Sequence, residues 1–175
     1  MYIEVKSKIN YEIYRDYMRF MLFKGKGYKI LPIILITTIS ISIVVLILSG
    51  LFLQRPFFNA SSVLLFIVLI LYLGIYFGLP KISYKKVKSV FPDETFYRFY
   101  DEHLEVVALG DIVKGIDTLK YKVFSKIYEV DSAFYLMMTN GTSMILTKQT
   151  MEAGAINYLS GFLAYRFGDK YKNCF

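Results

Sequence analysis

The sequence contains little of what most metal and redox chemistry needs. Its 175 residues include one cysteine, one histidine, four prolines and no tryptophan. A single cysteine excludes an intramolecular disulfide, and one cysteine with one histidine excludes a zinc site built from clusters of these residues. We therefore expect Cys174 to remain a free thiol.

The composition combines a high apolar content with an excess of basic residues. Hydrophobic residues make up 55% of the chain, mean hydropathy is +0.44, and 21 Lys and Arg against 14 Asp and Glu give a formal net charge of +7. Two full independent cores are improbable below about 200 residues, so the chain has room for one domain, or for one small domain beside membrane spans. This composition is not that of an ordinary soluble domain.

Two long uncharged runs predict a pair of transmembrane helices. Ile30–Leu53 has 24 residues without an ionisable side chain, and as a helix it would be about 36 Å long, enough to cross a bilayer with some tilt. Its 17 Ile, Leu, Val and Phe residues favour insertion by about 7 kcal/mol before the polar residues are counted. The second run, Val63–Leu79, has 17 residues without a charge. We predict helices over 30–53 and 63–80, joined by a short extracytoplasmic turn over 54–62; a buried pair of soluble helices is the disfavoured alternative.

Lysines flank these runs on one side only. Three precede the first run and four follow the second, whereas the connecting turn carries Arg55 alone. The positive-inside rule therefore predicts a multi-pass membrane protein with both termini cytoplasmic. The seven residues are Lys24, Lys26, Lys29, Lys81, Lys85, Lys86 and Lys88. They account for the whole net charge, so nucleic acid is not implied. They either set the topology alone or also recognise anionic lipid.

The segment 1–29 predicts a cytoplasmic strand and an amphipathic helix. Tyr2–Ile9 alternates apolar and charged residues, as a half-buried strand does. Asn10 can then cap a helix from Tyr11 to about Phe23, whose apolar stripe is opposed by a stripe of mixed charge. The mixed signs favour packing against the cytoplasmic domain over a position among the lipid headgroups.

After Lys88 the pattern changes to six short strands followed by one helix. The predicted strands are Thr95–Tyr100, His103–Leu109, Ile116–Tyr121, Val123–Val130, Phe134–Thr139 and Ser143–Thr147. A helical period then runs from Thr150 to about Phe167. This order indicates a membrane α+β fold with a cytoplasmic domain over 89–175, an antiparallel sandwich or partly open barrel capped by the C-terminal helix. Tyr2–Ile9 could add a seventh strand.

The chain resembles the YcxB-like membrane proteins of bacteria. The resemblance covers nearly the whole chain and is carried by the two-span hairpin, by an aromatic run leading into a Phe-Tyr-Leu strand, and by the Ile-Leu-Thr-Lys segment over 145–148, where Thr147 replaces the usual proline. The residues of the aromatic run and the strand are Tyr121, Phe124, Lys126, Ile127, Glu129, Phe134, Tyr135 and Leu136. The resemblance implies a pleckstrin-homology-like (PH-like) soluble domain, a location in the bacterial plasma (inner) membrane and no catalytic residue.

Residues that could carry chemistry are few. One group of carboxylates and a histidine surrounds the first hairpin of the C-terminal domain: Asp93, Glu94, Asp101, Glu102, His103 and Glu105. His103 and Glu105 share a strand face, but two ligands do not make a metal site, so we interpret the group as a solvated turn. No serine lies in a GxSxG elbow. We expect no enzyme activity, no metal and no cofactor.

The spans themselves indicate a packing role. They contain no ionisable group of the kind that coupled transport needs. Gly74 and Gly78 form a GxxxG step that would serve either close packing of the two helices or self-association into a homo-oligomer. We therefore predict a non-enzymatic interaction or regulatory module tethered to the lipid bilayer, with an unidentified protein partner. The alternative is a small membrane component of transport or toxin-immunity type whose spans carry the function.

Overall fold

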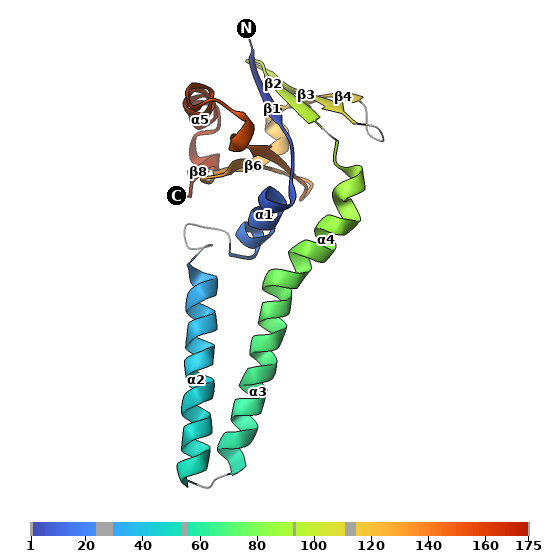
Figure 1. Ribbon diagram of the computed structural model, residues 1–175. Coiled ribbons are helices and arrows are strands. Elements are labelled where there is room, and N and C mark those ends of the chain that lie inside the picture. Colours follow the sequence, from blue (N-terminus) through green and yellow to red (C-terminus); the bar gives the residue numbers. More distant parts are fainter. Residues whose placement is uncertain (1, 24–29, 54–55, 93, 111–114, 175) are drawn as a thin grey trace. The chain divides into compact units, whose positions relative to one another are not determined.

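The chain divides into an apolar helical unit and a mixed α+β unit (Figure 1). The structure is a computed structural model that describes residues 2–23, 30–53, 56–92, 94–110 and 115–174. The helical unit covers Met18–Ser83, and the α+β unit joins Met1–Tyr17 to Tyr84–Phe175. The predicted cytoplasmic domain over 89–175 is therefore extended by a segment from the beginning of the chain.

The helical unit contains an antiparallel pair of apolar helices, α2 (Leu31–Leu53) and α3 (Pro56–Leu73), which lie side by side in Figure 1. Both are apolar on all sides, and side chains such as Ile41 and Leu64 are more than 60% exposed. By length and composition, two helical segments could cross a membrane, Pro32–Gly50 and Val63–Val87. This agrees with the two uncharged runs of the sequence.

The second long helix begins earlier than predicted. α3 starts at Pro56, so the turn predicted over 54–62 is wrong for residues 56–62, while residues 54–55 lie outside the described part of the chain. Proline is well tolerated at a first helical position, because the N–H it lacks would have no helical partner there. The polar residues near the start of α3 therefore belong to the helix and do not mark a loop.

The helix also continues past Pro80, where we predicted its end. A π-helical turn over Gly74–Gly78 leads directly into α4 (Leu79–Val87). In this turn the N–H of Leu79 bonds to the C=O of Gly74, five residues back. The wider turn accommodates a proline ring that would otherwise clash with the carbonyl four residues earlier.

The α+β unit begins as its pattern predicts. β1 (Ile3–Ser7) buries Val5 and Ser7. The side chain of Asn10 then caps α1 (Tyr11–Phe23), because its Oδ1 accepts a hydrogen bond from the N–H of Ile13 at 2.9 Å. The helix bounds agree with those predicted.

Two sheets follow from the remaining strands. Their elements are β2 (Glu94–Phe99), β3 (His103–Leu109), β4 (Gly115–Lys120), β5 (Phe124–Glu129), β6 (Ala133–Met138), β7 (Ser143–Thr147) and β8 (Tyr171–Asn173). The first sheet is antiparallel with the order β1-β2-β3-β4, and the second has the order β7-β6-β5-β8. The N-terminal strand therefore joins the sheet as the suggested seventh strand, with Ile3 opposite Phe99 and Ser7 opposite Thr95.

The C-terminal helix α5 (Ala153–Phe167) shares one core with both sheets. Its buried residues Leu159, Leu163 and Phe167 join a cluster from the strands. The helix starts at Ala153 rather than at Thr150 because residues 148–150 form a 3₁₀ turn. It ends at Gly168, whose φ of +49° is favourable only for glycine. The chain then returns as β8, a strand we did not predict, parallel to β5.

The first half of α1 packs against the second sheet. The rings of Tyr17 and Tyr135 meet edge to face at 5.2 Å, and the Tyr17 hydroxyl forms a hydrogen bond with that of Ser143. The ring of Tyr14 lies 5.5 Å from that of Tyr84. These contacts agree with the prediction, made from the mixed charges on one face of this helix, that it packs against the domain formed by the later strands.

Candidate functional site

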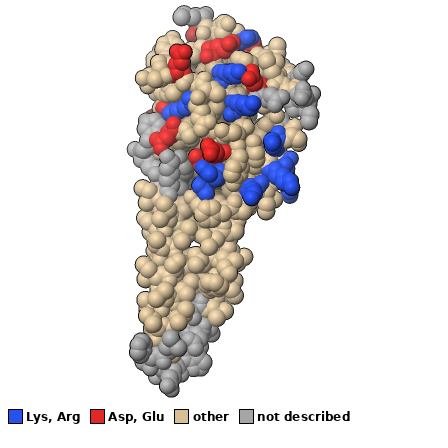
Figure 2. Space-filling view, viewed as in Figure 1, with Lys and Arg blue, Asp and Glu red and all other residues tan. Residues whose placement is uncertain are grey.

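The predicted basic residues lie on exposed helical turns. Lys81, Lys85 and Lys86 belong to α4, Lys88 starts the 3₁₀ turn over Lys88–Val90, and all four side chains are exposed. In Figure 2 blue atoms gather where α4 lies, whereas the described surface of α2 and α3 shows neither charge. Lys24, Lys26 and Lys29 lie outside the described residues. The four described lysines are therefore accessible at the surface.

Gly74 and Gly78 do not form the close contact between helices that one of our two interpretations required. A Cβ added at either position would meet no described atom within 4 Å. Both glycines lie in the π-helical turn, which presents Tyr76 to Arg19: the guanidinium carbon is 4.2 Å from the centre of the Tyr76 ring. Intramolecular packing is therefore a wrong assignment for these glycines, and the self-association interpretation is untouched.

A free backbone edge on β1 is the first component of a groove. At the β2–β3 turn, the N–H of Tyr100 bonds to the C=O of His103 at 2.9 Å. Counting back from Tyr100, every second residue of β2 directs its backbone N–H and C=O groups to β3, and the residues between direct theirs to β1. Glu4 and Lys6 lie opposite residues of β2 that bond to β3. The backbone N–H and C=O groups of Glu4 and Lys6 therefore point away from β2. The C=O of Lys6 accepts the Thr150 hydroxyl at 2.5 Å.

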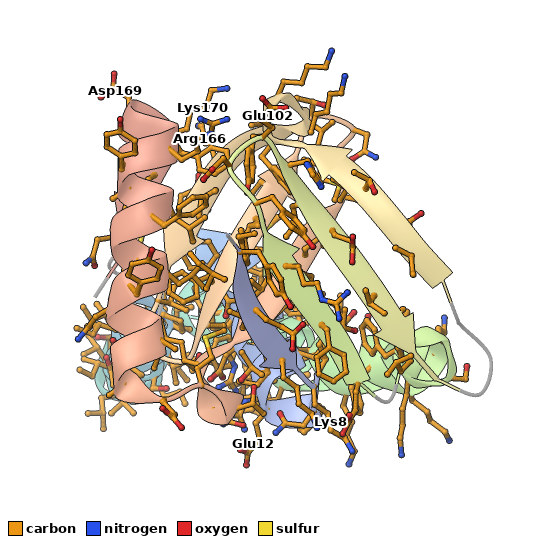
Figure 3. All side chains as sticks on the ribbon, turned by 90° about the horizontal axis from the view of Figure 1, so that it is seen from above. Lys8, Glu12, Glu102, Arg166, Asp169 and Lys170 are labelled. Atoms are coloured by element: carbon orange, nitrogen blue, oxygen red, sulfur yellow. The ribbon has the colours of Figure 1, made fainter. Side chains whose placement is uncertain are left out.

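An aromatic pocket lies between β1 and α5. It has a volume of about 270 Å³ and is lined by Tyr2, Ile3, Phe99, Asp101, Tyr158 and Phe162. Four of these six residues are aromatic, and Asp101 supplies the single charge. Tyr158 is 61% exposed on α5. Figure 3 shows α5 beside the sheet, with Glu102, the neighbour of Asp101 in the chain, at the end where Arg166 lies.

A second pocket of about 270 Å³ follows along the same two elements. It is lined by Glu4, Val5, Lys6, Thr150, Met151, Glu152 and Ala155. Together the two pockets are lined by the consecutive residues 2–6, which include most of β1, and by residues of α5 and of the segment just before it. We call them together the β1–α5 groove.

Ion pairs across the first sheet occupy the charges of β1. Arg98 donates from Nε to Glu4 Oε2 at 2.6 Å and from Nη1 to Glu105 Oε1 at 2.9 Å. The hydrogen bond to Glu4, and then that to Glu105, raise the pKa of the Arg98 guanidinium above its usual range. Lys6 Nζ lies 2.6 Å from Glu94 Oε1.

Two acidic groups of the groove are left without such a partner. Neither Asp101 nor Glu152 forms an ion pair or side-chain hydrogen bond with any described residue. The groove therefore combines aromatic faces, a free strand edge and unpaired negative charge, a combination that suits a cationic extended ligand.

A buried polar network lies on the other side of α5. Glu129 Oε1 is 2.6 Å from Lys148 Nζ and accepts from Ser160 Oγ at 2.8 Å, while the Tyr171 hydroxyl donates to Oε2. The side chains of Glu129 and Lys148 are 5% and 9% exposed. The network joins β5, the turn after β7, α5 and β8. Because its atoms are buried and mutually satisfied, we interpret it as structural.

Three members of the carboxylate and histidine group of the first hairpin, Glu94, His103 and Glu105, are occupied by other contacts. His103 and Glu105 do lie on one face of β3, but Glu105 binds Arg98 and the ring of His103 stacks on Tyr100 at 4.7 Å. Within the described ranges, no three His, Cys, Asp or Glu side chains come close enough to hold a metal ion. Asp93 lies outside those ranges.

The β1–α5 groove was not predicted from the sequence. Tyr2, Asp101 and Tyr158 lie far apart along the chain, and no spacing rule links them. The one signal that could have suggested the groove was the suggested pairing of the N-terminal strand with the C-terminal domain, which leaves one edge of that strand free.

Fold and surface together define an α+β protein with two helices that are long and apolar enough for a membrane. Comparison with protein-family models, curated proteins and solved structures found no match.

Proposed function

We propose that this chain is a two-span protein of the bacterial plasma membrane that holds a PH-like domain at the cytoplasmic face, where the domain acts as a non-enzymatic interaction or regulatory module. One observation carries the proposal: most of the described apolar side chains of α2 and α3 are exposed or only partly buried, for example Ile33, exposed at 61%, and Val63, exposed at 59%. Contact of this surface with water is unfavourable by about 25 cal/mol per Å², whereas lipid would cover it.

The PH-like and YcxB-like assignments belong to the same proposal. They are supported by the order of two sheets followed by a C-terminal helix, which agrees with the fold that the resemblance implies. Two residues of the resembling segments, Glu129 and Lys148, form the buried ion pair. Their pairing supports a role in holding the fold, as a motif without catalytic residues would have.

The orientation with both termini in the cytoplasm follows from the lysines on one side of the hairpin. Single cysteines can test it in a Cys174→Ala background: Lys8→Cys and Lys170→Cys should be protected from an impermeant thiol reagent in intact cells, and Arg55→Cys should be labelled. Labelling of Lys170→Cys without permeabilisation would reject the orientation.

Photo-cross-linking in the full-length chain separates the interaction module from the alternative, a transport or immunity component that acts through its spans. A photoreactive residue at exposed Tyr158 or Tyr165 samples the domain, and one at exposed Ile41 or Leu64 samples the hairpin. A defined protein adduct from the domain positions supports the proposal. Adducts from the hairpin positions alone would support the alternative.

A further inference from the structure

The β1–α5 groove has three properties that select the same kind of ligand. Its wall is lined by tyrosine and phenylalanine side chains, its unpaired charges are acidic, and its floor is a strand edge whose Glu4 N–H and C=O point outward. Aromatic faces attract cations, carboxylates pair with them, and a free edge binds extended backbone. We propose that the groove binds an extended, basic peptide segment of a partner protein, which adds to β1 as a strand and places a Lys or Arg side chain in the aromatic pocket beside Asp101.

The charges around the aromatic pocket leave Asp101 available to a ligand. Arg98, a cation of the same sheet, is held by Glu4 and Glu105. Arg166 lies over the ring of Tyr121, with its guanidinium carbon 5.1 Å from the ring centre. Among the described residues, neither arginine forms an ion pair with Asp101.

The distance between the two pockets sets the spacing of the basic residues. The aromatic pocket takes its β1 residues from Tyr2 and Ile3, and the second pocket, with Glu152, extends to Lys6. Four residues of a strand span about 13 Å, and side chains four residues apart point to the same face. We therefore choose a ligand with two basic residues at i and i+4, so that one can enter the pocket that Asp101 lines and the other the pocket that Glu152 lines.

This inference rests on the proposed function, because it names the partner class of the same domain. Acidic groups in the groove make an anionic lipid surface the less favourable occupant. Vesicles rich in phosphatidylglycerol serve as a competitor in the test. If such vesicles occupy the groove themselves and so release the peptide, the assignment to a peptide is overturned.

The test uses the full-length chain in nanodiscs with zwitterionic lipid and a fluorescent ten-residue peptide of alternating threonine and valine that carries two lysines four residues apart. The control peptide has glutamates in place of the lysines. We expect salt-sensitive binding of the lysine peptide and at least tenfold weaker binding of the glutamate peptide. Equal binding of the two peptides, or no binding of either, would overturn the proposal.

Variants of the chain locate the binding. Asp101→Asn and Tyr158→Ala should each weaken it about two- to five-fold, the range for an exposed ion pair or cation–π contact. Asp169→Asn and Tyr165→Ala are matched controls, since both residues are exposed and lie outside the groove, and they should bind as the parent does. Tyr158 and Asp101 are exposed enough that loss of the fold is not expected. Unchanged affinity of both groove variants would overturn the site.

N-methylated peptides test the strand addition. Methyl groups on alternate amides that face β1 should abolish binding, and methyl groups on the other amides should leave it within about two-fold, because only one edge of an added strand bonds to the sheet. Equal effects of the two sets would refute strand addition.

The double variant Tyr158→Ala with Asp101→Asn distinguishes failure of this inference from failure of the proposed function. If the double variant no longer binds the peptide but still forms the same photo-cross-linked partner adduct from other domain positions, the groove is not the partner site and the proposed function stands.

Discussion

The Lys148→Met substitution should strongly destabilise the α+β unit, because it leaves a buried carboxylate without its cation. Lys148 Nζ lies 2.6 Å from Glu129 Oε1, and both side chains are less than 10% exposed. The ammonium group also lies 4.6 Å from the centre of the Phe134 ring. Methionine has nearly the same length and fills the same space, so the change removes charge and hydrogen bonding with little loss of packing.

The expected loss is about 3 kcal/mol. Removing one partner of a buried ion pair costs about 3–5 kcal/mol, since the other partner remains buried and uncompensated. The lower end applies here because the hydroxyls of Ser160 and Tyr171 still donate to Glu129. The double variant Glu129→Gln with Lys148→Met should lose only about 1 kcal/mol, because the amide oxygen accepts from one of these hydroxyls, the amide NH2 can donate to the other, and no net charge is buried.

Hydrogen exchange of the full-length chain in nanodiscs measures this loss. A loss of about 3 kcal/mol accelerates exchange of the β5 and β6 amides about 100-fold, at one factor of ten per 1.4 kcal/mol. Lys126→Met, an exposed lysine on β5, is the matched control and should change stability by less than about 0.5 kcal/mol. If Lys148→Met differed from this control by less than about 1 kcal/mol, or if the double variant were as unstable as the single one, the reasoning would be refuted.

Three further predictions follow from the same structure. Burial raises the pKa of Tyr121 to about 12, above the ordinary value of 10, so as pH rises the unfolded chain loses this proton first and stability should fall between pH 10 and 12. Tyr121→Phe should flatten this slope of stability against pH, measured by urea unfolding at pH 9 to 11.5, and an unchanged slope would contradict the assignment. Gly74→Ala with Gly78→Ala should leave the hairpin equally stable or stabilise it by up to about 1 kcal/mol per residue, because no described atom lies near the added Cβ; a lower stability in steric trapping would show a close contact. Lys85→Glu with Lys88→Glu should reduce the orientation preference, at about 1 kcal/mol per lysine near an anionic leaflet; cysteine labelling that still finds a single orientation would count against it.

The elements with a clear local period were predicted closely. The bounds of α1, β3 and β7 agree with those read from the sequence, and α2 begins one residue later. In each case the pattern of apolar residues over 5 to 23 positions is enough to select helix or strand, because one face of the element must be covered by core or lipid. The cap at Asn10 is equally local, since its side chain bonds three residues ahead.

The errors concern features that depend on contacts distant in sequence. β8 has only three residues and no period, and it forms because β5 offers an edge beside the end of α5. The helix continues through Pro80 because a π-helical turn precedes it, which no rule based on proline position anticipates. The predicted close packing of the two helices at Gly74 and Gly78 is not found, because a GxxxG step permits close approach but does not ensure that a neighbour is present.

The sequence by itself determined the two apolar helices, the basic flank, the capped N-terminal helix and the alternation of short strands with a final helix, because each follows from periodicity or charge within one segment. The tertiary structure alone decided the pairing of β1 with β2, the burial of Glu129 with Lys148, and the β1–α5 groove, in which Tyr2, Asp101 and Tyr158 meet. These features join residues up to 160 positions apart, as Tyr2 and Phe162 are, and only the packing of two sheets and a helix around one core brings such residues together.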